Sequence, residues 1–396
     1  MKIDEIKYII QSAHINFLYG SGVSRPYLQT LGNIEKFLTK LEEDNSLDYG
    51  VKKIVRASLY KSYSEGVIIP NSSFPKNDNN LQVTENAYKQ FFSIWNDLIN
   101  KRNSLLLEKQ VNLFTTNIDL IVEDSLSNSG LELNDGFRGT LQPSFDESNF
   151  QISLSKSSLQ YHKTSEIPVF NLMKIHGAVN WDNIGGIIFS NQKRCAKLKD
   201  LLDKIPSSYF VDLHKKDDNN EERERTYEEL VEAARNNRLR SSDVFKPFFE
   251  EYDKIVMINP TKSKFKTSVL DYHFYELMRI YSNALEREDS VLFVMGFSFA
   301  DEHLAQITKR AAATNPTLQV IVFAYTDNDK SYLLKNLGIE GKGPNNNIEI
   351  ITPTSFRTSN SSDKDYETLC NEVNRFDLNT INKVFNAISY GIHSAI

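Results

Sequence analysis

The sequence predicts an α/β fold, with a mostly parallel β-sheet covered by helices on both faces and a helical subdomain inserted into it. Short apolar runs rich in β-branched residues recur along the chain, and helical periodicity separates several of them. Strands that alternate with helices favour a parallel sheet. The run Leu318–Ala324 is almost wholly apolar, as a strand buried on both faces should be. The expected strands are His14–Tyr19, Val111–Thr115, Val169–Ile175, Lys254–Ile258, Ser290–Met295, Leu318–Tyr325 and Ile348–Ile351.

Length, charge and cysteine content limit the classes of protein to which this chain can belong. The chain has 396 residues, of which 40% are hydrophobic and 25% charged, as expected of a globular protein with a large core. Its net charge of −6 gives no basic footprint, so direct nucleic-acid binding is not expected. No apolar run approaches the length of a membrane span, and we expect a soluble, cytoplasmic protein. Cys195 and Cys370 are its two cysteines, too few for a disulfide framework or a Cys-x-x-Cys metal site.

Long helical segments interrupt the strand pattern. The segment between the first two expected strands is too long for one crossover, and Tyr27–Leu41, Gly50–Tyr63 and Asn86–Ile99 show helical periodicity. Near the C-terminus, Arg357–Asp365 is polar and is expected to be a loop before further helices. The expected division is a sheet domain of residues 1–45, 105–192 and 251–356, helical insertions at 46–104 and 193–250, and a C-terminal helical extension at 357–396.

The first expected strand runs into the glycine turn Gly20-Ser21-Gly22-Val23-Ser24-Arg25, which we expect to open a helix. Glycines let the backbone turn sharply and approach a ligand, and the first amides of a helix bind anions. No Gly-Lys-Ser or Gly-Lys-Thr follows, which excludes a P-loop, and the third glycine of the dehydrogenase fingerprint is missing. The turn therefore predicts a phosphate-binding loop or, alternatively, an ordinary connection between a strand and a helix.

Polar side chains follow the second strand, in Thr115-Thr116-Asn117-Ile118-Asp119. Asn117 and Asp119 are expected near the carboxyl edge of the sheet, where an amide and a carboxylate can hold a ligand. The alternative is that both residues cap the helix that follows.

The third and fourth motifs also come at the ends of strands. His176-Gly177 ends the third strand, where an imidazole can act as a general base, and no other histidine pairs with a glycine turn. Gly296-Phe297-Ser298 follows a later strand, where glycine and serine can contact ribose or phosphate or can form a plain turn.

The four motifs, taken in this order, resemble the sirtuin family of NAD-consuming enzymes, over about residues 14–325. The resemblance implies a Rossmann-like NAD-binding domain. It also implies a phosphate-binding loop formed by Gly20, Ser21, Gly22, Ser24 and Arg25. Asn117 and Asp119, with Thr116 beside them, would contact the ribose and the carboxamide, and His176 would be the catalytic base. Gly296 and Ser298 would form a second phosphate and ribose contact. Asp327 is a further candidate for the adenosine end.

One departure from the sirtuin pattern changes the expected reaction. Sirtuin deacylases carry a zinc module built on two Cys-x-x-Cys pairs, and two cysteines cannot supply one, so we expect no zinc. The pattern is similar to that of bacterial antiphage sirtuin-like proteins, which hydrolyse NAD+ outright. That similarity implies a homo-oligomer that partners a HerA-type hexameric ATPase, with hydrolysis of NAD+ controlled by assembly.

Two alternatives remain beside NAD+ hydrolysis. One is a non-catalytic sensor that binds NAD or a related nucleotide and gates a partner, although such a sensor needs neither the Asn117 amide nor the His176 base. The other is an NAD-dependent protein deacylase with a zinc-free substrate groove.

Overall fold

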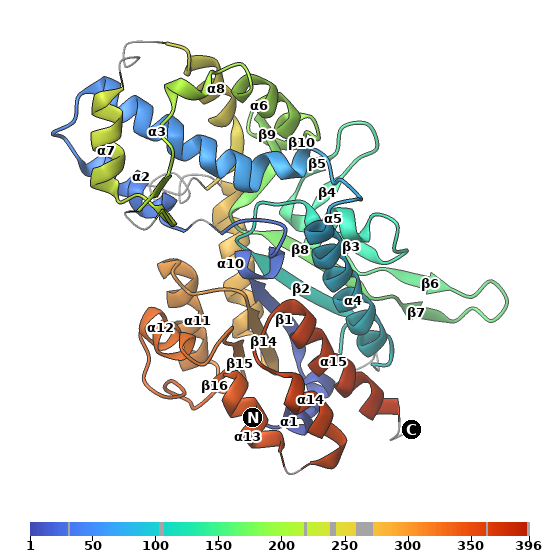
Figure 1. The fold of residues 1–396 in the computed structure, drawn as a ribbon. Coiled ribbons are helices and arrows are strands. Elements are labelled where there is room, and N and C mark those ends of the chain that lie inside the picture. Colours follow the sequence, from blue (N-terminus) through green and yellow to red (C-terminus); the bar gives the residue numbers. More distant parts are fainter. Residues whose placement is uncertain are drawn as a thin grey trace.

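The expected parallel sheet is present in the computed structural model of the chain (Figure 1). The structure describes residues 1–30, 32–102, 107–217, 220–237, 243–258, 272–361 and 363–393. Seven strands lie in the order β16-β15-β14-β1-β2-β8-β3, and each neighbouring pair is parallel. They are β1 (His14–Tyr19), β2 (Gln110–Thr115), β3 (Glu132–Asn134), β8 (Val169–Lys174), β14 (Ser290–Met295), β15 (Gln319–Phe323) and β16 (Ile348–Ile351). The α/β prediction is confirmed.

The strand order places a topological switch between β1 and β14. From β1 the chain builds the sheet outward through β2 and β8, whereas β14, β15 and β16 extend it on the other side. Ligands of open α/β sheets bind outside the carboxyl ends of the strands at such a switch. Gly20 follows β1 and Gly296 follows β14, so both glycine motifs meet there.

A row of hydrogen-bonded asparagines, of which Asn16 and Asn171 are buried, fixes the register of four strands. The Asn112 Nδ2 donates to Asn16 Oδ1 at 2.9 Å, Asn171 Nδ2 donates to Asn112 Oδ1 at 3.0 Å, and Asn134 Nδ2 donates to Asn171 Oδ1 at 3.0 Å. These residues are direct partners in the parallel ladders. A shift of any strand would leave buried amides unpaired, which is unfavourable, so the row holds the strand ends at a common level.

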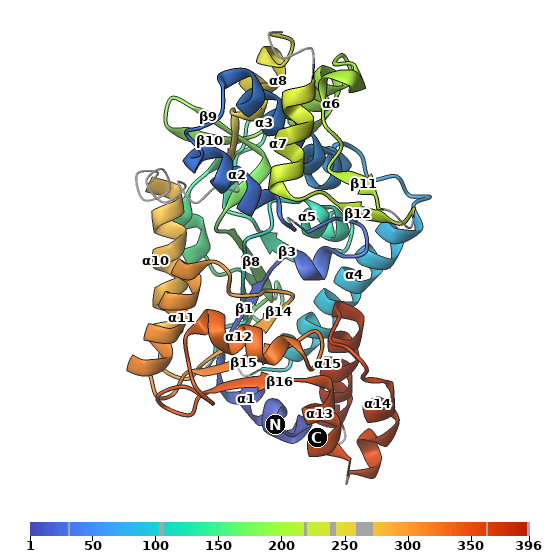
Figure 2. The same ribbon diagram turned by 60° about the vertical axis from the view of Figure 1, so that its left-hand side comes forward.

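Helices cover both faces of the sheet, as Figures 1 and 2 show. Alternate strand residues point to two separate apolar cores: Phe17 and Phe293 to one, Leu18 and Val294 to the other. The first core is closed by α1 (Ile3–Ser12), α4 (Asn79–Asn100), α5 (Ile121–Leu126), α13 (Pro353–Asn360), α14 (Glu367–Glu372) and α15 (Leu378–His393). The second is closed by α10 (Tyr272–Glu286), α11 (Glu302–Thr314) and α12 (Asp329–Leu337).

In the described part of the expected insertion at 46–104, the two α-helices have different surroundings. Helix α3 (Tyr49–Tyr63) lies in a helical lobe above the sheet, whereas α4 packs on the sheet itself. The Trp95 ring on α4 meets Phe17 edge-on at 4.9 Å between centroids and Phe385 of α15 at 4.9 Å. An aromatic helix face of this kind is stabilised by burial against the sheet, so α4 is part of the main core.

The helical lobe combines segments from both expected insertions. Helix α2 (Ile34–Glu43) and α3 pack beside α6 (Arg194–Leu202), α7 (Tyr227–Asn236) and α8 (Lys246–Tyr252) in one apolar cluster. A second, antiparallel sheet of order β13-β9-β10-β5-β4 adjoins them. Its strands are β4 (Phe137–Arg138), β5 (Ser144–Phe145), β9 (Gly177–Ile184), β10 (Ile187–Ser190) and β13 (Ile255–Met257).

The segments Lys254–Ile258 and Arg357–Asp365 differ from the sequence prediction. The segment Lys254–Ile258 was expected in the parallel sheet, but its strand β13 pairs antiparallel with β9 in the second sheet. The reason is topological, because β13 follows the lobe helices and meets the strand that leaves the His176–Gly177 turn. The polar segment at Arg357–Asp365 was expected to be a loop, but its first residues belong to α13, which Thr352 caps and Pro353 begins.

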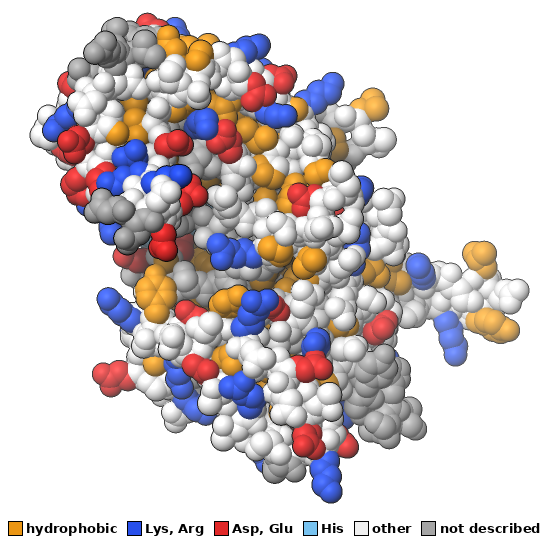
Figure 3. Space-filling model, viewed as in Figure 1, with side chains coloured by type: hydrophobic (Ala, Val, Ile, Leu, Met, Phe, Trp, Pro, Cys, Tyr) orange, Lys and Arg blue, Asp and Glu red, His pale blue; other side chains and the backbone are white. Residues whose placement is uncertain are grey.

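Two small hairpins lie outside these layers: β11 (His214–Lys216) with β12 (Glu222–Glu224), and β6 (Ser155–Ser157) with β7 (Thr164–Glu166). The second projects from the body (Figure 3). Leu159 and Tyr161, in the turn between β6 and β7, are 96% and 75% exposed. Among the described residues, none of the helices combines the length and apolar character that crossing a bilayer requires.

Candidate functional site

The carboxyl ends of β1, β2, β8 and β14 open into a cavity of about 690 Å³. Its far wall comes from the lobe, where Gln29, Glu35 and Tyr63 face it. The structure brings together at this cavity ten of the residues expected from sequence: Gly20, Ser21, Gly22, Ser24, Thr116, Asn117, Asp119, His176, Gly296 and Ser298.

Two further candidates lie elsewhere. The Arg25 side chain is exposed, and this residue does not line the cavity. The Asp327 carboxylate accepts hydrogen bonds from the backbone N–H and the hydroxyl of Thr354, at 3.0 and 2.8 Å, and also lies outside the lining. Neither residue is therefore placed to hold a ligand in this cavity.

The two glycine turns pack directly on each other. A Cβ on Gly20 would lie 2.7 Å from the Gly296 carbonyl oxygen, and one on Gly22 would lie 2.8 Å from the Gly296 Cα. Gly22 N–H donates to the Gly296 carbonyl at 3.1 Å. Glycine is thus required at this crossing by close backbone approach. The expected helix after the first turn is a short 3-10 segment, Ser21–Ser24, and α2 begins only at Ile34.

Asn117 and Asp119 are joined through Ser24. The Asn117 Nδ2 donates to the Gly20 carbonyl and to Ser24 Oγ, each at 3.1 Å, and Ser24 Oγ donates to Asp119 Oδ2 at 2.9 Å. Asp119 Oδ1 also accepts from the N–H of Ile121, the first residue of α5, at 3.2 Å, while Leu120 occupies the N-cap position. Asn117 instead ties the glycine turn to the end of β2, which the capping alternative did not anticipate.

His176 pairs with a carboxylate that sequence reasoning did not assign to the site. Its Nε2 lies 3.0 Å from Asp301 Oδ2, while Asp301 Oδ1 accepts from the backbone N–H groups of His303 and Leu304 at the start of α11. Burial would raise the pKa of Asp301, but the hydrogen bond and charge of His176, with the Leu304 N–H, outweigh it and hold that pKa at about 2. Asp301 is therefore ionised and orients the imidazole.

The backbone before Asp301 is strained. Phe299 is 1% exposed and has φ of +56°, a left-handed conformation that bulky residues rarely adopt. Gly296 at φ +58° opens the same segment. Such strain persists where the surrounding packing over-determines it, often at functional sites. Here the strained segment places Asp301 opposite His176. In the sequence, the sign of Asp301 is an aspartate directly before an acidic helix start, and this pattern by itself indicates only a helix cap.

The fold and the cavity define a class: an α/β protein with a ligand site at the topological switch of a parallel sheet, containing an oriented histidine and an amide–hydroxyl–carboxylate network. Residues 249–341 match the family model of the SIR2-like domain. This range contains Gly296, Ser298 and Asp301, and the match supports a sirtuin-like relationship and NAD-related activity. No curated protein matches the chain.

Across the described ranges, no group of three or more His, Cys, Asp or Glu side chains is arranged to hold a metal ion. Cys195 and Cys370 are buried and unbridged, and burial raises the pKa of the Cys195 thiol to about 12.

Proposed function

We propose that this chain is an NAD+ glycohydrolase, which cleaves the nicotinamide–ribose bond to release nicotinamide and ADP-ribose. The observation that carries the proposal is the convergence on one cavity of the His176–Asp301 pair, the Asn117–Ser24–Asp119 network and two interlocked glycine turns. The His176–Asp301 pair supplies a base. The Asn117–Ser24–Asp119 network supplies polar groups for the ribose, carboxamide and water, and the glycine turns bring the backbone close to the phosphates. The cavity volume of about 690 Å³ lies within the range of ~300–1,000 Å³ typical of small-molecule sites.

In the proposed reaction, the bond between ribose C1′ and the nicotinamide nitrogen breaks and its electron pair leaves with nicotinamide. A water oxygen bonds to C1′, and the water proton passes to His176. Asp301 holds the imidazole and stabilises the imidazolium that forms. Asn117 and Asp119 orient the ribose, the carboxamide and the water, which lowers the entropic part of the barrier.

We expect purified protein incubated with NAD+ alone to release nicotinamide and ADP-ribose in equal amounts, as measured by chromatography. A parallel reaction contains an acyl-lysine peptide, and the control protein is His176→Ala. Turnover that requires the peptide would support a deacylase instead. Binding of NAD+ without turnover would support a sensor, and either outcome would overturn the proposal.

We further propose that hydrolysis serves antiphage defence by NAD depletion and is controlled by homo-oligomer assembly or by a HerA-type ATPase. The resemblance to antiphage sirtuin-like proteins supports this role. Uncontrolled NAD+ hydrolysis would harm the host cell, which is the motivation for control. Full turnover by an isolated monomer in the same assay would contradict that control.

The Asp301→Asn variant tests the role of the His176 partner. Asparagine is as good a helix cap as aspartate, so α11 keeps its start while the negative charge is lost. We expect turnover to fall about 10²-fold through misplacement of the imidazole. Unchanged turnover would show that Asp301 serves only as a cap.

A further inference from the structure

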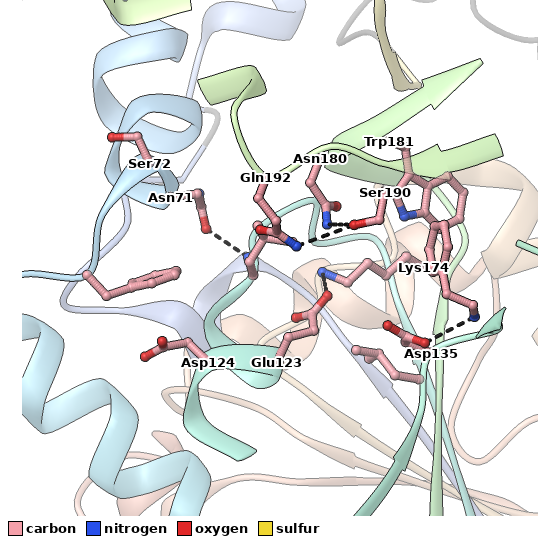
Figure 4. Close-up of a pocket in the computed structure, with 14 residues that line it drawn as sticks. Asn71, Ser72, Glu123, Asp124, Asp135, Lys174, Asn180, Trp181, Ser190 and Gln192 are labelled. Atoms are coloured by element: carbon pink, nitrogen blue, oxygen red, sulfur yellow. Dashed lines mark hydrogen bonds and ion pairs between the residues drawn. The ribbon is translucent and has the colours of Figure 1, made fainter. Parts of the chain in front are cut away.

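A second cavity, of about 370 Å³, lies on the other side of the Asp119–Leu120 backbone and shares no lining residue with the first (Figure 4). It is bounded by α5, the ends of β8 and β3, the β9–β10 hairpin and the segment before α4. Nothing in the proposed NAD+ reaction uses it.

The charges that line this cavity are mainly negative. Glu123, Asp124 and Asp135 face one cation, Lys174. The Lys174 Nζ is already engaged, at 2.9 Å from Glu123 Oε1 and in contact with the Asp119 carbonyl oxygen. Asp124 is paired with the mostly exposed Lys76 at 3.0 Å. Asp135 forms no ion pair among the described residues; its Oδ1 accepts from the Phe137 N–H at 3.0 Å, and the more distant charge of Lys174 does not offset the rise that burial gives its pKa.

Two buried acceptor atoms in this lining lack donors in the described part of the chain: Glu123 Oε2 and Asn180 Oδ1. Asn180 is 8% exposed, and its Nδ2 donates to Ser190 Oγ at 3.1 Å, which leaves the amide oxygen unused. Figure 4 shows the Asn180 amide bonded to Ser190. A buried acceptor without a donor is destabilising, so these atoms favour an occupant that brings N–H or O–H groups.

Aromatic side chains form the remaining walls. Phe74, Phe137 and Trp181 line the cavity, and Trp181 is 3% exposed. Aromatic faces attract organic cations and pack against flat apolar groups. Burial also raises the pKa of Glu123 and of Asp135, so both carboxylates would be stabilised by a cation that entered.

We propose that this cavity is a binding site for a small organic cation, a protonated amine carried on an aromatic body. The ammonium group donates to the unpaired acceptors and neutralises the excess carboxylate charge, and the aromatic body packs against Phe74, Phe137 and Trp181. A cavity of about 370 Å³ accommodates an occupant of that size.

The site is mechanically linked to the first cavity. The Leu120 N–H donates to Asn71 Oδ1 at 2.7 Å, and Lys174 Nζ donates to the Asp119 carbonyl oxygen. Asn71 and Lys174 both line the second cavity, so two of its lining residues bind the backbone segment that carries Asp119. An occupant that bonds to Glu123 therefore acts on the backbone position of Asp119. This consequence for turnover rests on the proposed function, whereas binding itself does not.

Three indole probes of similar shape test the proposal by titration calorimetry on the full chain: tryptamine, which is cationic, tryptophol, which is neutral, and indole-3-acetate, which is anionic. We expect tryptamine to bind about tenfold or more tightly than tryptophol, because a charged donor gains more from carboxylates, and indole-3-acetate to bind weakest. Equal affinity for tryptamine and tryptophol, or no binding of tryptamine, would overturn the proposal whatever the outcome of the NAD+ assay.

Substitutions of the lining carboxylates test whether tryptamine binds in this cavity. Asp135→Asn keeps the hydrogen bond to Phe137 and the Lys174–Glu123 pair but removes one charge, and it should weaken tryptamine binding about tenfold. Glu123→Gln should do the same, and the exposed Asp200→Asn on α6 serves as the charge-matched control. Tryptamine should also slow amide hydrogen exchange at residues 118–124. Unchanged affinity in the Asp135 variant together with unchanged exchange would place the probe elsewhere and refute this site.

Discussion

Replacing His176 by alanine is expected to lower NAD+ hydrolysis by about 10²- to 10⁴-fold, the contribution of a positioned general base. The side chain lies at the cavity between the end of β8 and the start of β9, and its Nε2 is held by Asp301. Without it, the attacking water has no base, although the polar groups around Asn117 still hold the substrate. We therefore expect kcat to fall far more than substrate affinity. Nicotinamide release at saturating NAD+ measures the effect.

Two further variants make this test specific. Asn117→Ala removes both the donor to Gly20 and the donor to Ser24, and a comparable loss is expected. His162→Ala serves as the matched control, because His162 is exposed in the β6–β7 hairpin and does not line the cavity. Thermal melting confirms that each variant folds. Wild-type turnover in folded His176→Ala would remove the assignment of His176 as the base.

Replacing Gly177 by alanine is expected to destabilise the fold by about 2–5 kcal/mol. Gly177 has φ of +75°, where a side chain costs ~1–2 kcal/mol, and its added Cβ would lie 2.1 Å from the Val256 carbonyl oxygen, so overpacking adds ~1–3 kcal/mol. The clash is with backbone of β13, which cannot rotate away. The midpoint of urea unfolding measures the change.

Gly186→Ala separates the two causes. Gly186 has φ of +86° with no atom within 4 Å of an added Cβ, so it retains the backbone strain without the clash. We expect this variant to lose only ~1–2 kcal/mol. Equal destabilisation of the two variants would show that close approach between β9 and β13 does not matter.

The local parts of the fold could be predicted from sequence. Buried strands such as β14 and β15 are marked by continuous apolar runs, and the glycine turns that follow β1 and β14 are marked by residue type. For the same reason, ten of the candidate residues could be placed at one edge of the sheet, since the carboxyl ends of parallel strands meet there. Arg25 does not line the cavity, and its role as a phosphate contact stays a prediction.

Other features depend on contacts between distant segments. Asp301 lies 125 positions from His176 in the chain, and no local pattern pairs them. The same holds for β13, whose apolar run is compatible with either sheet, and for α4, whose periodicity does not say which surface it covers.

By itself, the sequence determined the strands, their glycine turns and the residue types at their ends, because backbone preference and hydrophobic periodicity act over a few neighbouring residues. The tertiary structure alone decided which strand ends share a cavity wall, which carboxylate orients His176 and how the carboxylates around Lys174 enclose a second cavity. These depend on burial and on close approach of segments far apart in the chain, where a side chain's partners, and not its own type, fix its charge, direction and role.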